Sequence, residues 1–443
     1  MLSHFLSSLK SSSLSTSVGC GLFGKRWKRW EDIGGVKYDE RVDPFRREVG
    51  RPQLEKGEDF HMSVDLMEHL LSIQDKAVVD GMFAHAESVQ QKNIGNKVHF
   101  RGIVEFSNVC RKNCNYCGIR RDMEDVERYT MSKEEILECA RWCFQNGYGS
   151  IMLQSGERTN RAHLNFLLDV IKSIRKESLE LDVEQRQGLG VALSVGEQSK
   201  DVYQELFDAG AHRYLLRIET SNPHLYSILH PRDGLHEFEI RLQCIRDLKQ
   251  VGFQTGTGVM IGLPGQSCRD LANDLMFFRD EDVDMIGMGP YVVQEHTPTG
   301  IEYLSRPQIT KEELFSLSLR MLALARITLR DVNLPATTAL QAIVPNGREI
   351  ALSCGANMLM PILTPTRYRK EYQLYEGKPC VDEGADECRD CLSNRVKWAG
   401  KEIGLWEWGD PKHFFRRTET EEPIIKQKKT TKTDKKEKEK KEH

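Results

Sequence analysis

The chain has 443 residues and a formal net charge of −3, with 29% charged and 39% hydrophobic residues. This composition is typical of a globular protein, and no stretch approaches the roughly 20 apolar residues that a membrane span requires. The charge is uneven, because residues 424–443 hold nine Lys and four acidic residues while the rest of the chain is acidic. We therefore expect no nucleic-acid partner for the body of the protein.

The first 96 residues are predicted to precede the main domain in two parts. Residues 1–24 hold eight Ser and no acidic residue, which is typical of an organelle presequence. This predicts a hydrogenosome or mitochondrial matrix location; a cytoplasmic protein with an N-terminal extension is the alternative. Residues 25–96 are predicted to be a helical segment, because apolar residues recur at near-helical spacing over 60–93.

Residues 97–363 alternate between strand-like and helix-like stretches, which predicts an α/β fold. The eight predicted strands are 98–106, 150–154, 190–195, 214–219, 255–261, 284–289, 334–338 and 358–363. Predicted helices between them include one with a capping box formed by Ser132 and Glu135, and stretches near 164–174, 202–209, 237–248, 271–278 and 311–329. Eight such units fit a closed (β/α)8 TIM-type barrel of about 250 residues, with a (β/α)6 barrel as the alternative. In such barrels, active sites lie at the carboxyl ends of the strands.

The last 80 residues are predicted to lie outside the barrel. Residues 364–415 form a C-terminal extension that contains aromatic residues and three Cys. Residues 416–443 are predicted to be a disordered, solvated tail, because the segment is Lys-rich and of low complexity.

The cysteines carry the strongest functional signal. The chain has twelve, and their clustering favours metal ligation over disulfides. Cys110, Cys114 and Cys117 form a C-x3-C-x2-C array directly after the first predicted strand. Three thiolates can hold three irons of a [4Fe–4S] cluster and leave the fourth iron open. A zinc knuckle is the alternative, but zinc usually takes four ligands and no fourth Cys or His lies nearby. Tyr116 could stack on a planar base.

The cysteine array is the signature of the radical S-adenosylmethionine (SAM) superfamily, which this chain resembles. The resemblance implies that SAM binds the open iron and is cleaved reductively to methionine and a 5′-deoxyadenosyl radical. The segment Ser155-Gly156-Glu157 is similar to a Gly-Gly-Glu segment that binds the SAM ammonium group in these enzymes, with Ser in place of the first Gly.

Arg217 and Glu219 are predicted to point into the barrel, because residues two apart share one face of a strand. Burying a charged pair inside the barrel costs free energy unless a ligand or another polar group binds it. SAM offers suitable partners for such a pair; a buried structural ion pair is the alternative.

Further motifs narrow the resemblance to the HydE family, the biotin-synthase-like radical SAM maturases of [FeFe]-hydrogenase. They are the Cys array, 217–222 (Arg-Ile-Glu-Thr-Ser-Asn), 262–266 (Gly-Leu-Pro-Gly-Gln) and 335–340 (Pro-Ala-Thr-Thr-Ala-Leu). The resemblance covers about residues 60–395 and assigns roles to particular residues. It implies SAM contacts at Arg217, Glu219 and Arg241, a small-anion site at Arg213, Thr337 and Thr338, and closure of the substrate cavity by Met360, Tyr372 and Tyr375.

The substrate and partners come from the resemblance alone. It implies an organometallic Fe(CO)2(CN)–cysteine precursor as the substrate in H-cluster assembly, the companion maturases HydF and HydG, and an electron donor such as ferredoxin. Another biotin-synthase-like radical SAM enzyme, for sulfur insertion or a methylornithine-type mutase reaction, is one alternative. A non-catalytic Fe–S carrier is another, although a carrier does not need the inward pair at Arg217 and Glu219.

A second cysteine group, Cys380, Cys388 and Cys391, lies in the C-terminal extension. Its spacing is similar to that of an auxiliary Fe–S site in part of the HydE family. The resemblance implies a [2Fe–2S] or [4Fe–4S] cluster, with zinc or redox-active thiols as alternatives.

Overall fold

A parallel sheet curled into a barrel forms the centre of the protein. The computed structural model describes residues 44–50, 62–184, 187–306 and 309–420, so the expected presequence and most of the expected tail lie outside the described residues. The strands, in pairing order, are β10 (Glu402–Ile403), β1 (Lys97–Ser107), β2 (Ser150–Ser155), β3 (Gly190–Ser194), β4 (Ala211–Leu215), β5 (Gln254–Thr257) and β7 (Met285–Ile286), and β9 (Met358–Leu359) pairs with β1.

Isolated bridges close this sheet into a ring. Met285 of β7 pairs with Asn333, Pro335 pairs with Met358 of β9, and β9 pairs with β1 at His99. All these pairings are parallel. The predicted (β/α)8 TIM-type barrel is therefore confirmed, with its seventh strand reduced to the two bridges. Pro335 gives a reason, because proline cannot donate to a β ladder.

Most strand boundaries differ from the prediction, and the fourth and fifth strands show it clearly. β4 ends at Leu215 rather than Glu219, and Glu219, with a φ of +68°, pairs with Val259 only through an isolated parallel bridge. The predicted strand 255–261 is split into β5 and the two-residue β6 (Met260–Ile261), which pairs with β8 (Gly289–Pro290).

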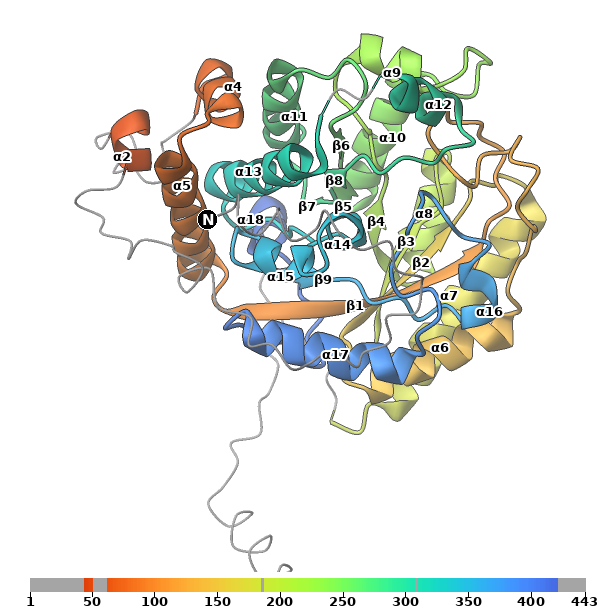
Figure 1. Cartoon of the computed structure of the whole chain (residues 1–443). Coiled ribbons are helices and arrows are strands. Elements are labelled where there is room, and N and C mark those ends of the chain that lie inside the picture. Colours follow the sequence, from red (N-terminus) through yellow and green to blue (C-terminus); the bar gives the residue numbers. More distant parts are fainter. Residues whose placement is uncertain (1–43, 51–61, 185–186, 307–308, 421–443) are drawn as a thin grey trace, which may run out of the picture.

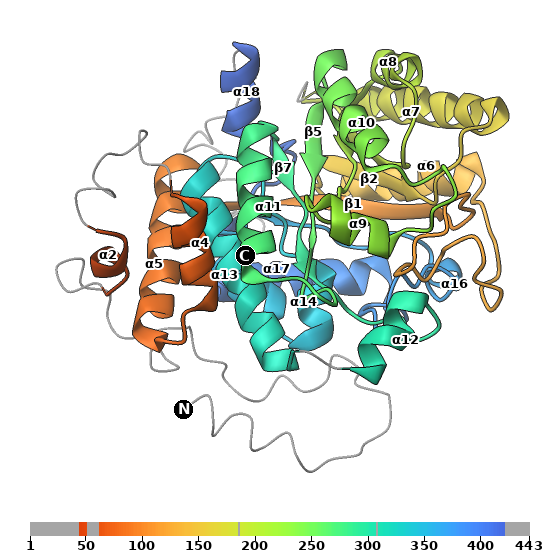
Figure 2. The same ribbon diagram turned by 90° about the horizontal axis from the view of Figure 1, so that it is seen from above.

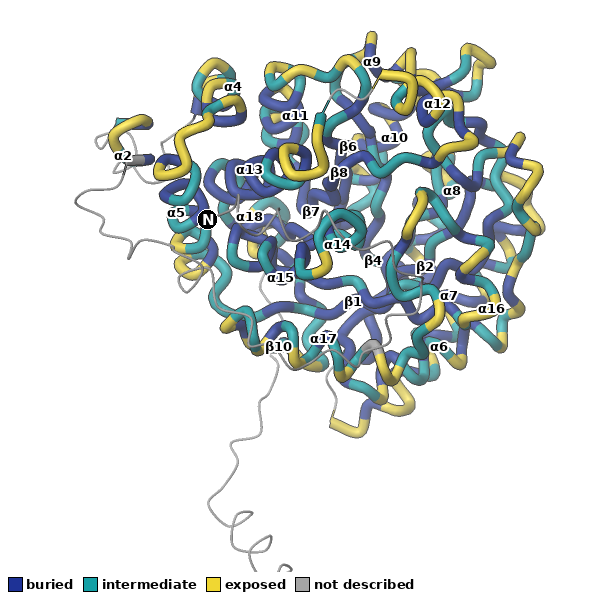
Figure 3. The backbone as a smooth tube through the Cα atoms, viewed as in Figure 1, coloured by how far each residue is buried: buried dark blue, intermediate teal, exposed yellow. Residues whose placement is uncertain are grey.

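Helices surround the barrel (Figure 1). They are α6 (Lys133–Gln145), α7 (Arg161–Leu181), α8 (Lys200–Asp208), α9 (Pro223–Leu229), α10 (Phe238–Val251), α11 (Cys268–Asp280), α12 (Pro298–Ser305), α13 (Lys311–Leu329), α14 (Thr338–Ile343) and α15 (Gly347–Leu352). The capping box of Ser132 and Glu135 is confirmed at the start of α6. Figure 3 shows the inner strands as mostly buried and the outer turns of the helices as exposed.

The N-terminal segment comprises α2 (Pro44–Val49), α4 (Val64–Ser72) and α5 (Lys76–Asn93). α4 packs on α11, and α5 packs on α13, so the expected helical preface is present. The helical stretch predicted over 60–93 is two helices, because Asp75 caps the start of α5 through the backbone N–H of Ala77.

The C-terminal extension comprises α16 (Thr366–Arg369), α17 (Ala385–Trp398), β10 and α18 (Lys412–Thr418). α18 therefore continues past residue 415, where the tail was expected to begin. Figure 2 shows α18 at one end of the barrel and α12 and α14 at the other. In the described ranges, no helix is long and apolar enough to cross a membrane.

Side chains fill the part of the barrel interior that lies away from the carboxyl ends of the strands. Met152, Ala192, Met285 and Met358 form a buried apolar cluster there. Ile103 packs against this cluster from β1, which shows that its side of the strand faces inward. Such packing is usual in these barrels and leaves the open space at the carboxyl ends of the strands.

Candidate active site at the carboxyl end of the barrel

The cysteine loop follows β1 and lies against the end of β2. The backbone N–H of Glu157 donates to Cys110 Sγ at 3.3 Å, and the N–H of Arg111 donates to the Glu157 carbonyl at 2.9 Å. A Cβ atom on Gly156 would lie 2.5 Å from the carbonyl oxygen of Val109 and 2.7 Å from Cys110 Cβ. Glycine is therefore required at position 156 for the two segments to meet.

The three thiols of this loop fit an iron–sulfur cluster. Burial raises the pKa of all three, that of Cys114 to about 12, and the proximity of the other cysteines adds to the rise at Cys114 and Cys117. Iron binding therefore displaces their protons and relieves the mutual repulsion of the sulfurs. Among the described residues, no three His, Cys, Asp or Glu side chains are grouped to hold a single metal ion. A [4Fe–4S] cluster spreads its thiolates over different irons, and the three cysteines of this loop can each bind one of them.

A histidine outside the loop fixes its backbone. The N–H of Asn113 donates to His236 Nε2 at 3.1 Å, and His236 Nδ1 lies 2.7 Å from Asp233 Oδ1. Asp233 thus keeps the proton on Nδ1 and leaves Nε2 as the acceptor. Burial lowers the pKa of His236, which maintains the neutral ring that this contact needs.

A buried charge network connects the loop to the strand ends. Lys112 Nζ donates to Glu197 Oε2 at 2.6 Å, and Arg241 Nε donates to the other oxygen of Glu197. Burial alone would raise the pKa of Glu197, but Arg241 and Lys112 outweigh it and hold the pKa below its usual value. Arg241, expected at the SAM carboxylate, is thus oriented by Glu197.

Glu157 is part of the same network. Its Oε1 accepts from Arg111 Nε at 2.9 Å and its Oε2 from the N–H of Glu197 at 2.8 Å. The neighbouring Ser155 hydroxyl donates to the carbonyl of Gly156. Both carboxylate oxygens are therefore occupied by the protein, and direct contact of Glu157 with SAM stays a prediction.

The expected inward pair is present and has unused hydrogen-bonding groups. Arg217 Nη2 lies 3.0 Å from Glu219 Oε2, but its hydrogen bond goes to the carbonyl of Val259 at 2.8 Å. Arg217 Nε is buried without a hydrogen-bond partner, and Glu219 Oε2 has the ion-pair contact with Arg217 but no hydrogen bond; burial raises the pKa of Glu219. Buried polar atoms of this kind are rare unless a ligand or water satisfies them, so the pair fits a polar ligand such as SAM.

Tyr116 lies edge-on to His230, with ring centroids 5.5 Å apart and planes at 88°. Its hydroxyl is 3.5 Å from His230 Nε2. The tyrosine thus has an aromatic partner of its own, and stacking on the SAM base stays a prediction.

Residues 371–378 cross the barrel mouth and are called the strap below. The strap carbonyls of Glu371 and Leu374 accept from Asn108 Nδ2 at 2.8 Å and from the N–H of Gly118 at 3.1 Å. The Tyr375 hydroxyl lies 2.9 Å from Thr338 Oγ1. The strap therefore holds together the cysteine loop and the start of α14.

Comparison with known proteins agrees with this arrangement. The profile of the Radical SAM superfamily matches residues 104–278. The [FeFe] hydrogenase maturase subunit HydE of Thermotoga maritima is 44% identical over 367 residues, which cover 83% of this chain and 99% of that protein. This chain belongs to the HydE family. It is a radical SAM enzyme, and the family implies a [4Fe–4S] cluster and SAM.

Solved structures show the same fold. A crystal structure of methylornithine synthase (PylB) has a TM-score of 0.66 at 20% identity, covering 81% of this chain and 98% of that one. A crystal structure of HydG, a maturase of the [FeFe]-hydrogenase, has a TM-score of 0.65 at 18% identity, covering 84% and 78%.

The small-anion site expected from the HydE family is only partly assembled. Arg213 is paired with Asp410 of the C-terminal extension and donates from Nε to Gln254 at 2.7 Å, so its charge is compensated by the protein. Arg213 Nη1 and Thr337 Oγ1 are buried without a hydrogen-bond partner, whereas Thr338 is bonded to Tyr375. An anion held by these residues stays a prediction.

The other expected cavity residues lie near the strap. Met360 is partly buried against the apolar cluster of the barrel interior. Tyr372 is buried, and burial raises its pKa. A wall of the substrate cavity formed by these residues stays a prediction.

The second cysteine group of this HydE-family chain is not shown to converge. Cys380 packs against the main hydrophobic core, and Cys391 Sγ accepts from Arg395 Nε at 3.3 Å. Cys388 lies in α17, and its side chain is outside the described part of the chain. The second cluster therefore stays a prediction.

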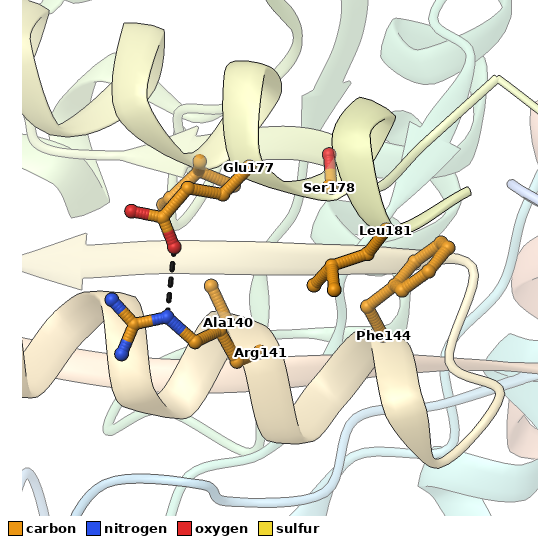
Figure 4. A pocket seen from close by; sticks show the side chains of 7 residues that line it. Ala140, Arg141, Phe144, Glu177, Ser178 and Leu181 are labelled. Atoms are coloured by element: carbon orange, nitrogen blue, oxygen red, sulfur yellow. Dashed lines mark hydrogen bonds and ion pairs between the residues drawn. The ribbon is translucent and has the colours of Figure 1, made fainter. Parts of the chain in front are cut away.

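A crevice between α6 and α7 lies outside the barrel (Figure 4). An ion pair of Arg141 and Glu177, 2.8 Å apart, crosses it, and Ala140, Phe144 and Leu181 line it. Its charged groups already pair with each other, so it belongs to helix packing rather than to the active site.

Proposed function

We propose that this chain performs the HydE step of [FeFe]-hydrogenase maturation. The observation that carries the proposal is the combination at one barrel mouth of the Cys110, Cys114 and Cys117 loop with the ion pair of Arg217 and Glu219, in which Arg217 Nε is buried without a hydrogen bond. A cluster carrier has no need for such an ion pair. The 44% identity to a HydE maturase along most of the chain supports the specific reaction.

In this proposal the three cysteines hold the [4Fe–4S] cluster. The bound cluster supplies one electron that cleaves SAM to methionine and a 5′-deoxyadenosyl radical. Glu197 orients Arg241 toward the SAM carboxylate, and Arg217 and Glu219 hydrogen-bond the remaining polar groups of SAM. The strap and the closed barrel exclude water from the radical, which would otherwise be quenched.

The substrate of the radical is proposed to be the organometallic Fe(CO)2(CN)–cysteine precursor of the H-cluster. HydF, HydG and an electron donor such as ferredoxin are the proposed partners. The second cysteine group is proposed to hold an auxiliary Fe–S cluster that the core chemistry does not require.

The test is activation of apo-[FeFe]-hydrogenase by purified, anaerobically reconstituted components. We expect hydrogen production only when this protein, SAM, HydF and HydG are all present, and none when Cys117→Ser replaces the wild type. Cys139→Ser, at a cysteine of α6 that packs on the core and contacts the Leu363 carbonyl rather than the cysteine loop, serves as the matched control and should support full activation. Activation that does not depend on this protein would contradict the proposal.

A further inference from the structure

Glu105 has a buried carboxylate inside the barrel, and the proposed reaction described above gives it no role. It lies in β1 at the same strand parity as Ile103, whose side chain packs in the barrel interior. Glu105 is 3% exposed. Lys378 of the strap donates to its Oε1 at 2.5 Å, while its Oε2 is buried without a hydrogen-bond partner. One oxygen of the carboxylate therefore has a hydrogen-bond partner in the protein, and the other has none.

Lys378 accounts only for Oε1 of Glu105. Its Nζ also donates to the carbonyl of Tyr372 at 2.9 Å and lies 5.2 Å from the centre of the Tyr372 ring. The ion pair therefore fastens the strap to β1. A purely structural pair would be expected to satisfy both carboxylate oxygens, because an unpaired buried acceptor on a charged group costs more than a neutral one.

The surroundings of Glu105 are those of the expected substrate cavity. Gln154 stands opposite Glu105 in the β1–β2 register, and its side chain is hydrogen-bonded to Tyr372. Burial raises the pKa of Tyr375 to about 12 and that of Tyr372 well above its ordinary value, and the charge of Glu105 adds to the rise at both. Proximity to Cys117 also contributes to the pKa of Tyr372. The carboxylate therefore lies among the two cavity tyrosines, on the side of the cysteine loop.

We propose that Glu105 Oε2 is a substrate-binding position that accepts a hydrogen bond from an amine or ammonium group of the substrate. This inference rests on the proposed function and adds to it the chemical class of the group recognised at β1. Lys378 donates to the other oxygen, Oε1, and fastens the strap. An anionic or purely acceptor group is rejected at this position, because it would face a buried negative charge.

The test compares two thiols that differ only in the amine, L-cysteine and 3-mercaptopropionate, by titration calorimetry against the reconstituted, SAM-bound enzyme. We expect wild type to prefer L-cysteine by about 10-fold or more, the range for a hydrogen bond to a charged group. Glu105→Gln should reduce the preference to about 3-fold or less. Lys378→Met, which removes the strap contact but keeps the carboxylate, should retain the preference.

The double variant Glu105→Gln/Lys378→Met separates ligand binding from strap closure. This variant removes both charges. If Glu105 served only to pair with Lys378, the double variant would regain the wild-type preference for L-cysteine. Our proposal predicts that the double variant behaves as Glu105→Gln does. Any of three results would overturn the proposal. They are a preference for L-cysteine that survives in Glu105→Gln, one that is restored in the double variant, and the lack of a preference in wild type.

The same preparations keep this proposal separate from the proposed function. The formation of 5′-deoxyadenosine from SAM with dithionite, in the absence of the thiols, is measured in parallel. Failure of wild type to cleave SAM would refute the proposed function, whereas the binding preference is read without any turnover. A lost amine preference in Glu105→Gln, in preparations whose wild type cleaves SAM, is the result that the proposal predicts.

Discussion

The residues that hold the cysteine loop come from distant parts of the chain. His236 accepts the N–H of Asn113, and Glu197 binds Lys112 and Arg241. The sequence shows no motif for these contacts, because they join segments that meet only when the barrel closes. Arg217 and Glu219 do pair, but strand alternation is not the reason, because both follow the end of β4 at Leu215 and Glu219 has a φ of +68°.

Glu197 provides a prediction at this scale. Glu197→Gln removes the negative charge that orients Arg241 and neutralises Lys112. Hydrogen bonds to charged groups contribute about 1.5–3 kcal/mol each, so we expect the Kd for SAM to rise about 10-fold or more. The measurement is equilibrium binding of SAM to the reconstituted enzyme, with iron content determined in the same samples.

Glu205→Gln is the matched control for this change. Glu205 makes an exposed ion pair with Arg161 on the barrel exterior, and exposed pairs contribute little. An unchanged SAM affinity in Glu197→Gln, at full iron content, would show that Arg241 does not depend on Glu197.

At the scale of elements, the C-terminal extension closes the barrel at the end away from the cysteine loop. Residues 404–411 lie across this end, where Asp410 pairs with Arg213 and the carbonyl of Gly409 accepts from Asn333 Nδ2 at 2.7 Å. α18 continues from this segment and is held by His413 and Arg417, which both pair with Asp284. The sequence predicted an extension but gave no sign of where it docks, because its contacts are single polar residues without periodicity.

Asp410→Ala tests this closure. The change leaves Arg213 buried beside only neutral partners, and breaking a buried ion pair typically costs about 3–5 kcal/mol. We expect the free energy of unfolding to fall by about that amount in urea denaturation. Glu402→Ala, at an exposed position in β10, should change it by less than about 0.5 kcal/mol. Equal stability of the Asp410→Ala variant and wild type would mean that the segment does not seal the barrel.

For the whole molecule, the order of strands and helices was predictable. Along residues 97–363, stretches with the two-residue hydrophobic period of a strand alternate clearly with stretches that have the 3.6-residue period of a helix. α13 begins and ends at the predicted residues, 311 and 329, since its capping box and long apolar face leave little freedom. The short strands near 285, 334 and 358 were harder to delimit. They are set by ring closure, which depends on the pairing of the first and last strands rather than on local sequence.

Buried histidines predict how the stability of the whole protein depends on pH. Burial lowers the pKa of His99 and His163 to about 4 and that of His230 to about 3. A histidine whose pKa is depressed in the folded state stabilises the fold above the unfolded pKa of about 6.5, and this contribution is lost as the pH falls below that value. Between pH 7 and 5.5, each of the three should cost about 1.2 kcal/mol.

Two groups act in the opposite direction. Burial raises the pKa of Asp274 to about 7. For His413, burial lowers the pKa, but Asp284 and Asp282 outweigh it, so the net shift is upward. Protonation of both therefore favours the fold at lower pH. We expect a net decrease in the free energy of unfolding from pH 7 to 5.5, because His212 and His236 also have lowered pKa values, measured by urea denaturation at both values. An increase would contradict the assignment of these histidines as neutral.

The most direct measurement is 5′-deoxyadenosine formation by the anaerobically reconstituted and reduced protein with SAM. We predict product from wild type and from Cys268→Ser, a control on the barrel exterior in α11. We predict none from Cys110→Ser, Cys114→Ser or Cys117→Ser. No product from wild-type protein that carries an intact cluster would contradict the account and favour a cluster carrier.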